Sequence, residues 1–124
     1  MWWIVGGIAL LILAGAKSGM AFTIKPGVFG TLQDVMMPAL DAVQRVWAAH
    51  GLRPTITSIE DGQHQVDSKH YQGLAFDIRF NDITPELHNR LTTEVAQLAG
   101  SAYDVIHESH GTDNDHLHIE FDPR

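Results

Sequence analysis

The sequence predicts an α+β domain, in which a small antiparallel sheet packs against flanking helices, preceded by an N-terminal hydrophobic helix. The segment 32–51 repeats apolar residues at steps of three and four, as an amphipathic helix does, and 84–99 has the start and stop residues of a second helix. Four short segments have the β-branched or alternating character of strands: 55–59, 73–80, 103–108 and 116–121. With 124 residues the chain is long enough for one small domain.

The first element in chain order is an uncharged apolar run, Trp2 to Ala16, which ends at Lys17. As a helix it would span roughly 22 Å, somewhat less than a ~30 Å hydrocarbon core. Small residues follow it, as they do in a signal peptide, although no Lys or Arg precedes it. Residues 1–21 are therefore interpreted as a membrane anchor or a signal segment, with a buried core helix as the third alternative. Either of the first two places the remaining chain outside the cytoplasm.

Residues 22–31, in a glycine- and proline-containing stretch, are expected to form a linker, and residues 32–124 the folded domain. The first helix starts near Leu32, carries Pro38 in its first turn and ends at Gly51. A strand is expected at 55–59 and a polar loop at 60–69. Along 73–80 apolar residues alternate with Asp77 and its neighbours, so Asp77 is expected on the face opposite the hydrophobic side.

The second helix begins at Thr84-Pro85-Glu86, which supply an N-cap, a first-turn proline and an early acidic residue, and Gly100 closes it. Two further strands, 103–108 and 116–121, flank a loop rich in Gly and Asp.

The composition excludes several functions. The chain has 15 acidic and 8 basic residues, and no Lys/Arg cluster interrupts this charge, so no nucleic-acid partner is expected. It has no cysteine, which excludes disulfides, a thiolate zinc site and a cysteine nucleophile. We expect a monomer.

Two remote segments contain the ligand types of a catalytic zinc ion. In the first, His70 ends a loop and Asp77 lies in the next strand, and a tight turn at Gly73 would let them converge. In the second, His116 and His118 are two apart, so they leave a strand on the same side. One of the two can bind metal while the other acts as a proton donor or stabilises an anion. Two imidazoles and a carboxylate suit a single zinc ion with an open position for water.

Asp115 precedes His118 by three residues, and strand alternation alone sends its side chain to the opposite face. It reaches the metal only if residues 113–115 belong to a loop, which their composition favours. The remaining histidines are interpreted as structural or solvent-exposed: His50, His64, His88, His107 and His110.

The pattern Ser68-x-His70-x-x-Gly73-x-Ala75-x-Asp77 resembles the first motif of the M15 zinc peptidases, the D-alanyl-D-alanine carboxypeptidase and L-alanyl-D-glutamate endopeptidase group. Asp115-x-x-His118, followed by Ile119-Glu120, is similar to their second motif, and the resemblance covers roughly residues 32–122. It implies the M15 or hedgehog-like DD-peptidase fold with zinc at the sheet's open face. It also implies zinc ligands at His70, Asp77 and His118, a general base at Asp115, and a ligand-orienting role for Ser68.

The sequence departs from the family pattern at one point. Family members commonly carry an arginine shortly before the first motif, where this chain has Ile59 to His64. Arg79 and Arg53 are the candidates for binding a substrate carboxylate, and Gln63, His64 or His116 for stabilising the oxyanion. The missing arginine favours an endopeptidase over a carboxypeptidase.

Members of this family cut peptides of bacterial peptidoglycan, and many are phage lysis or tail-associated enzymes. The resemblance thus implies a cell-wall hydrolase of endolysin type, acting extracytoplasmically and tethered to the membrane or exported. Asp115 would take a proton from the zinc water, and Asp115 or His116 would return one to the leaving amine. The alternatives are a non-catalytic zinc-binding module that recognises wall peptides or a protein partner, and a membrane-anchored structural protein with incidental histidines.

Overall fold

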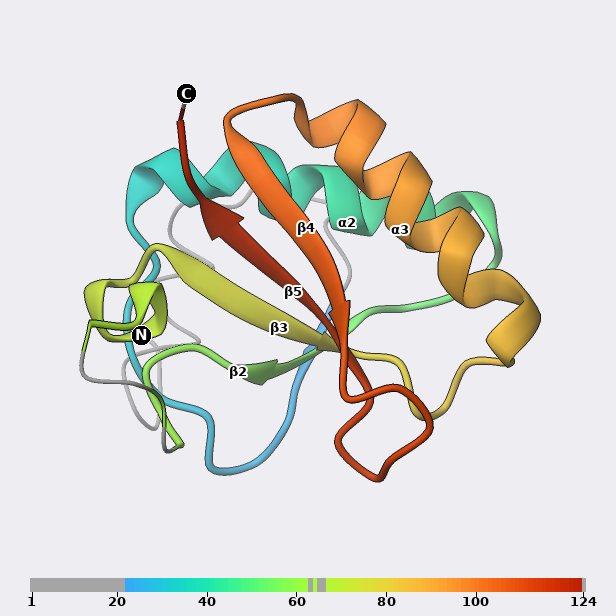
Figure 1. Ribbon diagram of the computed structural model, residues 1–124, viewed down its shortest axis with the longest axis horizontal. Helices are drawn as coiled ribbons and strands as arrows, with labels where there is room; N and C mark the ends of the chain where they lie inside the picture. The colour runs from blue at the N-terminus through green and yellow to red at the C-terminus, as the bar shows by residue number, and fades with distance from the viewer. Residues whose placement is uncertain (1–21, 63, 65–66, 124) are drawn as a thin grey trace.

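The computed structural model describes residues 22–62, 64 and 67–123, which form an α+β domain with a five-stranded mixed sheet and two α-helices (Figure 1). The strands lie in the order β1-β2-β3-β5-β4. In chain order the elements are β1 (Thr23–Ile24), the 3-10 helix η1 (Asp34–Met36), α2 (Met37–Ala49), β2 (Thr55–Ser58), the 3-10 helix η2 (Lys69–Gln72), β3 (Ala75–Arg79), α3 (Pro85–Ala99), β4 (Tyr103–Glu108) and β5 (His116–Phe121).

The two helices confirm the sequence prediction closely. Pro38 lies in the first turn of α2, and Gly51 follows the helix at φ 72°, a left-handed conformation that glycine adopts without a steric penalty. The α3 helix begins at the predicted proline, Pro85, and ends immediately before Gly100. The first helical turn of the 32–51 segment is the separate 3-10 helix η1.

The sheet differs from the prediction at one edge. Strands β2, β3, β5 and β4 pair antiparallel as expected, but β1 runs parallel to β2, so the sheet is mixed. The segment 22–31 is therefore more than a linker, because Thr23 and Lys25 donate backbone hydrogen bonds to Pro54 O (2.8 Å) and Ile56 O (2.9 Å). Two residues are too few to show a strand period, so only the tertiary pairing reveals this strand.

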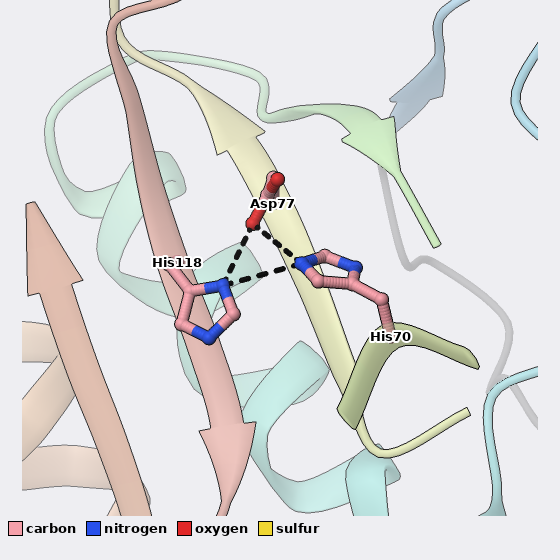
Figure 2. A group of neighbouring side chains, drawn as sticks. All are labelled: His70, Asp77 and His118. Carbon is pink, nitrogen blue, oxygen red and sulfur yellow. Dashed lines mark hydrogen bonds and ion pairs between the residues drawn. The ribbon is translucent and has the colours of Figure 1, made fainter. Parts of the chain in front are cut away.

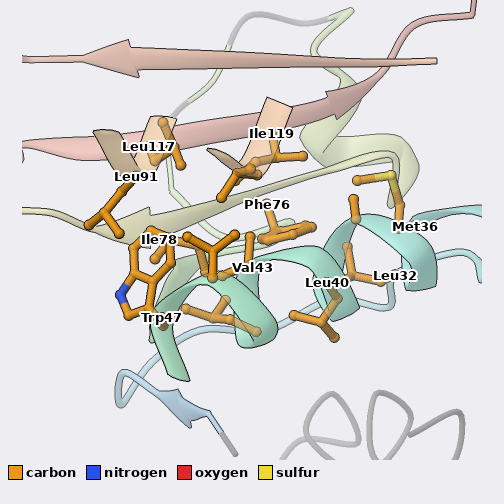
Figure 3. Close-up of a cluster of buried hydrophobic side chains, with 14 of the residues drawn as sticks. Leu32, Met36, Leu40, Val43, Trp47, Phe76, Ile78, Leu91, Leu117 and Ile119 are labelled. Atoms are coloured by element: carbon orange, nitrogen blue, oxygen red, sulfur yellow. The ribbon is translucent and has the colours of Figure 1, made fainter. Parts of the chain in front are cut away.

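The hydrophobic core lies between the helices and one face of the sheet (Figures 1 and 3). Trp47 from α2, Phe76 from β3, Leu91 from α3 and Leu117 from β5 are all at most 1% exposed. Burying one such side chain contributes about 1.5–3 kcal/mol. Because side chains alternate along a strand, fixing this face on the helices turns the intervening residues of β3 and β5 to the opposite, open face.

The expected membrane anchor or signal segment, residues 1–21, lies outside the described residues. Neither α2 nor α3 has the length and apolar character needed to cross a bilayer.

Candidate metal centre

The pairing of β3 with β5 positions two of the predicted ligands. Asp77 and His118 are direct partners in the antiparallel register, so their side chains leave the open face side by side. The His118 Nδ1 atom lies 3.0 Å from Asp77 Oδ1. Both residues are buried, at 9% exposure or less.

The third ligand, His70, comes from η2. The Ser68 hydroxyl accepts the His70 backbone N–H (3.1 Å) and so caps this short helix. Gly73 ends it at φ 71°, and a Cβ there would lie 2.2 Å from Thr31 O, so the turn requires glycine. The turn brings His70 Nε2 within 3.2 Å of both Asp77 Oδ1 and His118 Nδ1 (Figure 2).

The remaining nitrogen of each imidazole is held by an acceptor. His70 Nδ1–H donates to Ile59 O (2.7 Å), and His118 Nε2–H donates to Glu120 Oε1 (2.7 Å). In the neutral rings, the lone pairs of His70 Nε2 and His118 Nδ1 therefore both point toward the Asp77 carboxylate. Two lone pairs and an anionic oxygen this close together require a cation between them, either a proton or a metal ion.

The spacing fits zinc. Ligands about 2.0–2.1 Å from a tetrahedral zinc ion lie about 3.3 Å apart, and the three atoms here are separated by 3.0, 3.2 and 3.2 Å. Histidine ligands whose second nitrogen donates to a carboxylate or a carbonyl are typical of zinc sites. All three predicted metal ligands are thus brought together in a group able to hold a divalent ion.

The charges of this group are strongly coupled. Burial alone would raise the pKa of Asp77, but hydrogen bonds from His118 and His70 outweigh it and hold that pKa well below its usual range. Burial alone would lower the pKa of His118, but its hydrogen bonds to Asp77 and Glu120 raise it to about 9. Before a metal binds, a proton on His118 therefore serves as the cation at neutral pH.

His116 lies beside the triad on the same face, as the two-residue spacing predicted. Its Nδ1–H donates to Asn114 O (2.6 Å), and its Nε2 lies 3.0 Å from Glu108 Oε1 and 3.6 Å from Asp77 Oδ2. Because the carbonyl fixes the proton on Nδ1, the contact between Nε2 and Glu108 needs one further proton, held by either partner. His116 and Glu108 thus form a pair that can accept and release a proton next to the metal ligands.

The structure does not bring the Asp115 carboxylate to the triad. Residues 113–115 lie outside the strands, as expected, but Phe80 N–H donates to Asp115 O (3.0 Å) and extends the pairing of β3 with β5 by one residue. Asp115 therefore follows strand alternation and turns with Leu117 toward the helices. There it accepts hydrogen bonds from His107 Nε2 (2.5 Å) and Gly111 N–H (2.8 Å). Burial would raise the pKa of Asp115, but these two bonds lower it below its usual value. The general-base role implied by the M15 resemblance has no support in this position.

A cleft of about 640 Å³ opens over the triad. Among the described residues that line it, four supply carboxylates, Asp67, Asp77, Glu108 and Glu120, and one, Lys69, supplies an ammonium. The Lys69 Nζ donates to Phe121 O (2.9 Å), which holds it at the end of β5. His64 completes one wall, with its ring stacked on His70 at a centroid distance of 4.0 Å.

The candidates for substrate binding are dispersed. Arg79 pairs with His116 in the register and lines an adjoining hollow of about 320 Å³, which shares Asp77 and Asn114 with the cleft. Arg53 is exposed in the connection before β2. Gln63 lies outside the described residues.

The chain matches no family model and no curated protein sequence. The likeness to the M15 peptidases therefore depends on the two sequence motifs alone.

Two functional candidates, Glu108 and Glu120, were not assigned roles from the sequence. Glu108 becomes visible only through the register of β4 with β5, where it pairs with His116. Glu120 could have been found locally, because it lies two residues after His118 on the same face of one strand.

Proposed function

We propose that this protein is a zinc-dependent peptidase that cleaves the peptide stems of bacterial peptidoglycan. The observation that supports it most directly is the convergence of His70 Nε2, His118 Nδ1 and Asp77 Oδ1, with both imidazoles oriented by hydrogen bonds from their other nitrogen. A zinc ion held there would polarise the scissile carbonyl and lower the pKa of a water in the cleft. The choice of peptidoglycan follows from the motif resemblance.

The residues around the triad can handle the protons of such a reaction. Glu108 faces the cleft with a half-exposed side chain, which makes it the candidate general base toward the attacking water. His116 Nε2, 3.0 Å away, can receive that proton and donate it to the leaving amine. This assignment replaces Asp115 by Glu108 and keeps His116 in its predicted role.

The charge of the cleft supports an endopeptidase. Even with the two positive charges of a bound zinc ion, the four carboxylates and one ammonium of the described lining leave a net negative charge, which disfavours a free C-terminal carboxylate, whereas an interior peptide bond carries no charge. The extracytoplasmic location, the membrane tether or export signal, and a phage or prophage lysis role depend on residues 1–21 and on the resemblance, and are part of the same proposal. We also propose that the protein acts as a monomer.

One observation favours the second candidate, a non-catalytic zinc-binding module for wall peptides. Asp115, the base that the motif implies, is turned away from the triad and bound by His107. A chain without a functional base would bind peptide and zinc but would not turn over substrate. Bound zinc does not separate the two functions, and cleavage does.

The test is to incubate the purified chain and zinc with peptidoglycan, then measure new amino termini and analyse the fragments by mass spectrometry. We expect cleavage nearer the sugar than the terminal D-alanine, and loss of both zinc and cleavage in His118→Ala. His50→Gln, which removes an imidazole far from the cleft, is the matched control. Zinc binding and wall-peptide binding without release of amino termini would overturn the peptidase in favour of the module, and full cleavage by His118→Ala would refute the site.

A further inference from the structure

A second group of two histidines and one aspartate lies on the helix-facing side of the sheet. His88 comes from α3, His107 from β4 and Asp115 from the residue before β5. Each offers one ligand atom, and these atoms all lie within 4.8 Å of one another. We propose that this group binds a second divalent metal ion of the zinc type, in a structural role that goes beyond the proposed peptidase function.

The group is enclosed by the fold. His88 is 7% exposed and Asp115 5%, and the His107 side chain 11%. Phe80 closes one side, with its ring stacked on His88 at 4.4 Å and edge-on to His107 at 4.9 Å. A buried carboxylate needs a compensating positive charge, and a coordinated cation supplies it.

The hydrogen bonds define which atoms are available. His88 Nε2–H donates to Phe80 O and Ile83 O, both at 3.0 Å, so His88 Nδ1 is the atom that keeps a lone pair. Asp115 Oδ2 accepts Gly111 N–H, which leaves Oδ1 facing His107 Nε2 at 2.5 Å. Backbone groups thus fix the outer atoms of His88 and Asp115. For His107 Nε2 and Asp115 Oδ1 to bind one zinc ion together, their 2.5 Å contact must lengthen to about 3.3 Å.

A plain histidine–aspartate hydrogen bond accounts for only part of this arrangement. Within the described part of the chain, His107 Nδ1 is buried and has no hydrogen-bond partner, so what Nε2 binds is the polar contact that orients this ring. The pair alone would also not require His88, whose ring lies 4.9 Å from that of His107. A metal ion uses the second imidazole and compensates the carboxylate, so it explains why these polar groups are buried together.

The position of this group indicates what a bound ion would stabilise. It would tie α3 to β4 and to the loop before β5, three consecutive segments of the chain that meet on the helix-facing side of the sheet. The same loop contains Asn114, whose carbonyl accepts the His116 Nδ1–H. A metal on the helix face would therefore hold in place the loop that orients His116 in the cleft on the other face.

The experiment uses the full chain with the first site removed by His70→Ala and His118→Ala. Zinc per chain is measured by mass spectrometry after dialysis, folding by circular dichroism, and zinc affinity by competition with a chromophoric chelator. We expect one zinc per folded chain and a rise in Tm on adding zinc. Adding His88→Gln or the near-isosteric Asp115→Asn should weaken zinc binding by at least ~10-fold, as loss of one ligand or its support does, whereas adding His50→Gln should not.

A folded first-site variant that binds no zinc overturns the second site, and so does zinc binding that both His88→Gln and Asp115→Asn leave intact. Asp115→Asn keeps the test decisive where His88→Gln does not fold, because it preserves the shape of the carboxylate. The two proposals fail separately. An unaltered chain with two zinc ions and no peptidase activity removes the proposed function alone, and one with a single zinc ion and full activity removes the second site alone.

Discussion

The two faces of the sheet carry the same three side-chain types in different surroundings. On the open face, the ligand atoms of His70, Asp77 and His118 lie 3.0–3.2 Å apart beneath a cleft of about 640 Å³. On the helix face, His88 and its two partners lie within 4.8 Å of one another and are covered by Phe80. The ligand types of the two groups are the same, so they do not distinguish a reactive metal site from a structural one. Access of a substrate to the group does distinguish them.

The boundary between the faces runs between two adjacent residues. Asp115 turns to the helices and His116 to the cleft, because consecutive residues at the start of β5 alternate between the two faces. A shift of the pairing register between β3 and β5 by one residue would exchange the two side chains, since the side-chain period of a strand is two. Substitutions made on one face at a time therefore test the proposed peptidase site and the proposed second metal site separately.

The largest expected effect is the difference in kcat between variants of two acidic residues, Glu108 on the open face and Asp115 on the helix face. Glu108→Gln removes the carboxylate that faces the cleft and should lower kcat by about 10²–10⁴-fold, with first-site zinc retained. Asp115→Asn changes the helix face and should lower kcat by less than about tenfold. Steady-state rates on a defined muropeptide, with zinc content measured in parallel, check both. A loss in Asp115→Asn as large as that in Glu108→Gln would show that Asp115 is the base after all.

The next effect concerns stability and uses two apolar residues of neighbouring strands. Leu117 faces the helices and is 0% exposed, whereas Ile106 pairs with His118 on the open face and is 43% exposed. Leu117→Ala should lower the free energy of unfolding by about 2–5 kcal/mol, a factor of ~30 to several thousand in the equilibrium constant. Ile106→Ala should cost about 0.5 kcal/mol. Urea unfolding of both variants measures the difference, and equal losses would contradict the assignment of the faces.

A smaller effect, on zinc affinity, is expected from the Glu120 carboxylate, which accepts a hydrogen bond from the metal ligand His118. Glu120→Gln leaves His70, Asp77 and His118 in place but weakens the acceptor that fixes the His118 ring. Zinc affinity of the first site should fall by about 10–100-fold. The control is Glu94→Gln, whose carboxylate pairs with His50 outside both clusters. Chelator competition gives both affinities, and equal affinities in the two variants would remove Glu120 from the site.

Much of this arrangement was predictable from the sequence, because local patterns determine it. Apolar periodicity predicts α2, the start and stop residues predict α3, and β-branched or alternating residues predict β2 to β5. The spacing of His116 and His118 predicts that they share a face. The ligand set His70, Asp77 and His118 followed from the two motifs, and the structure brings these three together. The loop expected at 113–115 is confirmed, but the backbone hydrogen bond from Phe80 to Asp115 still turns this side chain away from the metal ligands.

The features that were missed depend on which strands are neighbours. Strand β1 is two residues long and exists through its pairing with β2. Glu108 reaches His116 because β4 and β5 are in register, and the cluster at His88 forms because α3 packs over β4 (Figure 1). These contacts depend on which elements become neighbours in the fold, so the apolar periodicity of a short stretch of sequence does not predict them.

The smallest expected effect is the change in zinc affinity of the first site with each pH unit. His118 has its pKa raised from 6.5 to about 9 by Asp77 and Glu120, against the opposing effect of burial. A zinc ion must displace that proton, so zinc affinity should rise about tenfold per pH unit from 6.5 and level off near 9. In the metal-free chain the free energy of unfolding has the opposite trend and falls as pH rises. Stabilisation by protonated His118 is fully present below the unfolded pKa of 6.5 and is lost as pH rises through about 9.

Both pH trends can be measured in Asp115→Asn, in which zinc binding at the second site is weakened. Zinc affinity at pH 6.5, 7.5 and 8.5, corrected for protonation of the competing chelator, gives the slope. Urea unfolding without zinc over the same range gives the opposing trend. An affinity that stays constant over these pH values would mean that His118 is already neutral in the folded chain. The Asp77 and His118 pair would then not hold the proton that the hydrogen bonds on the open face require.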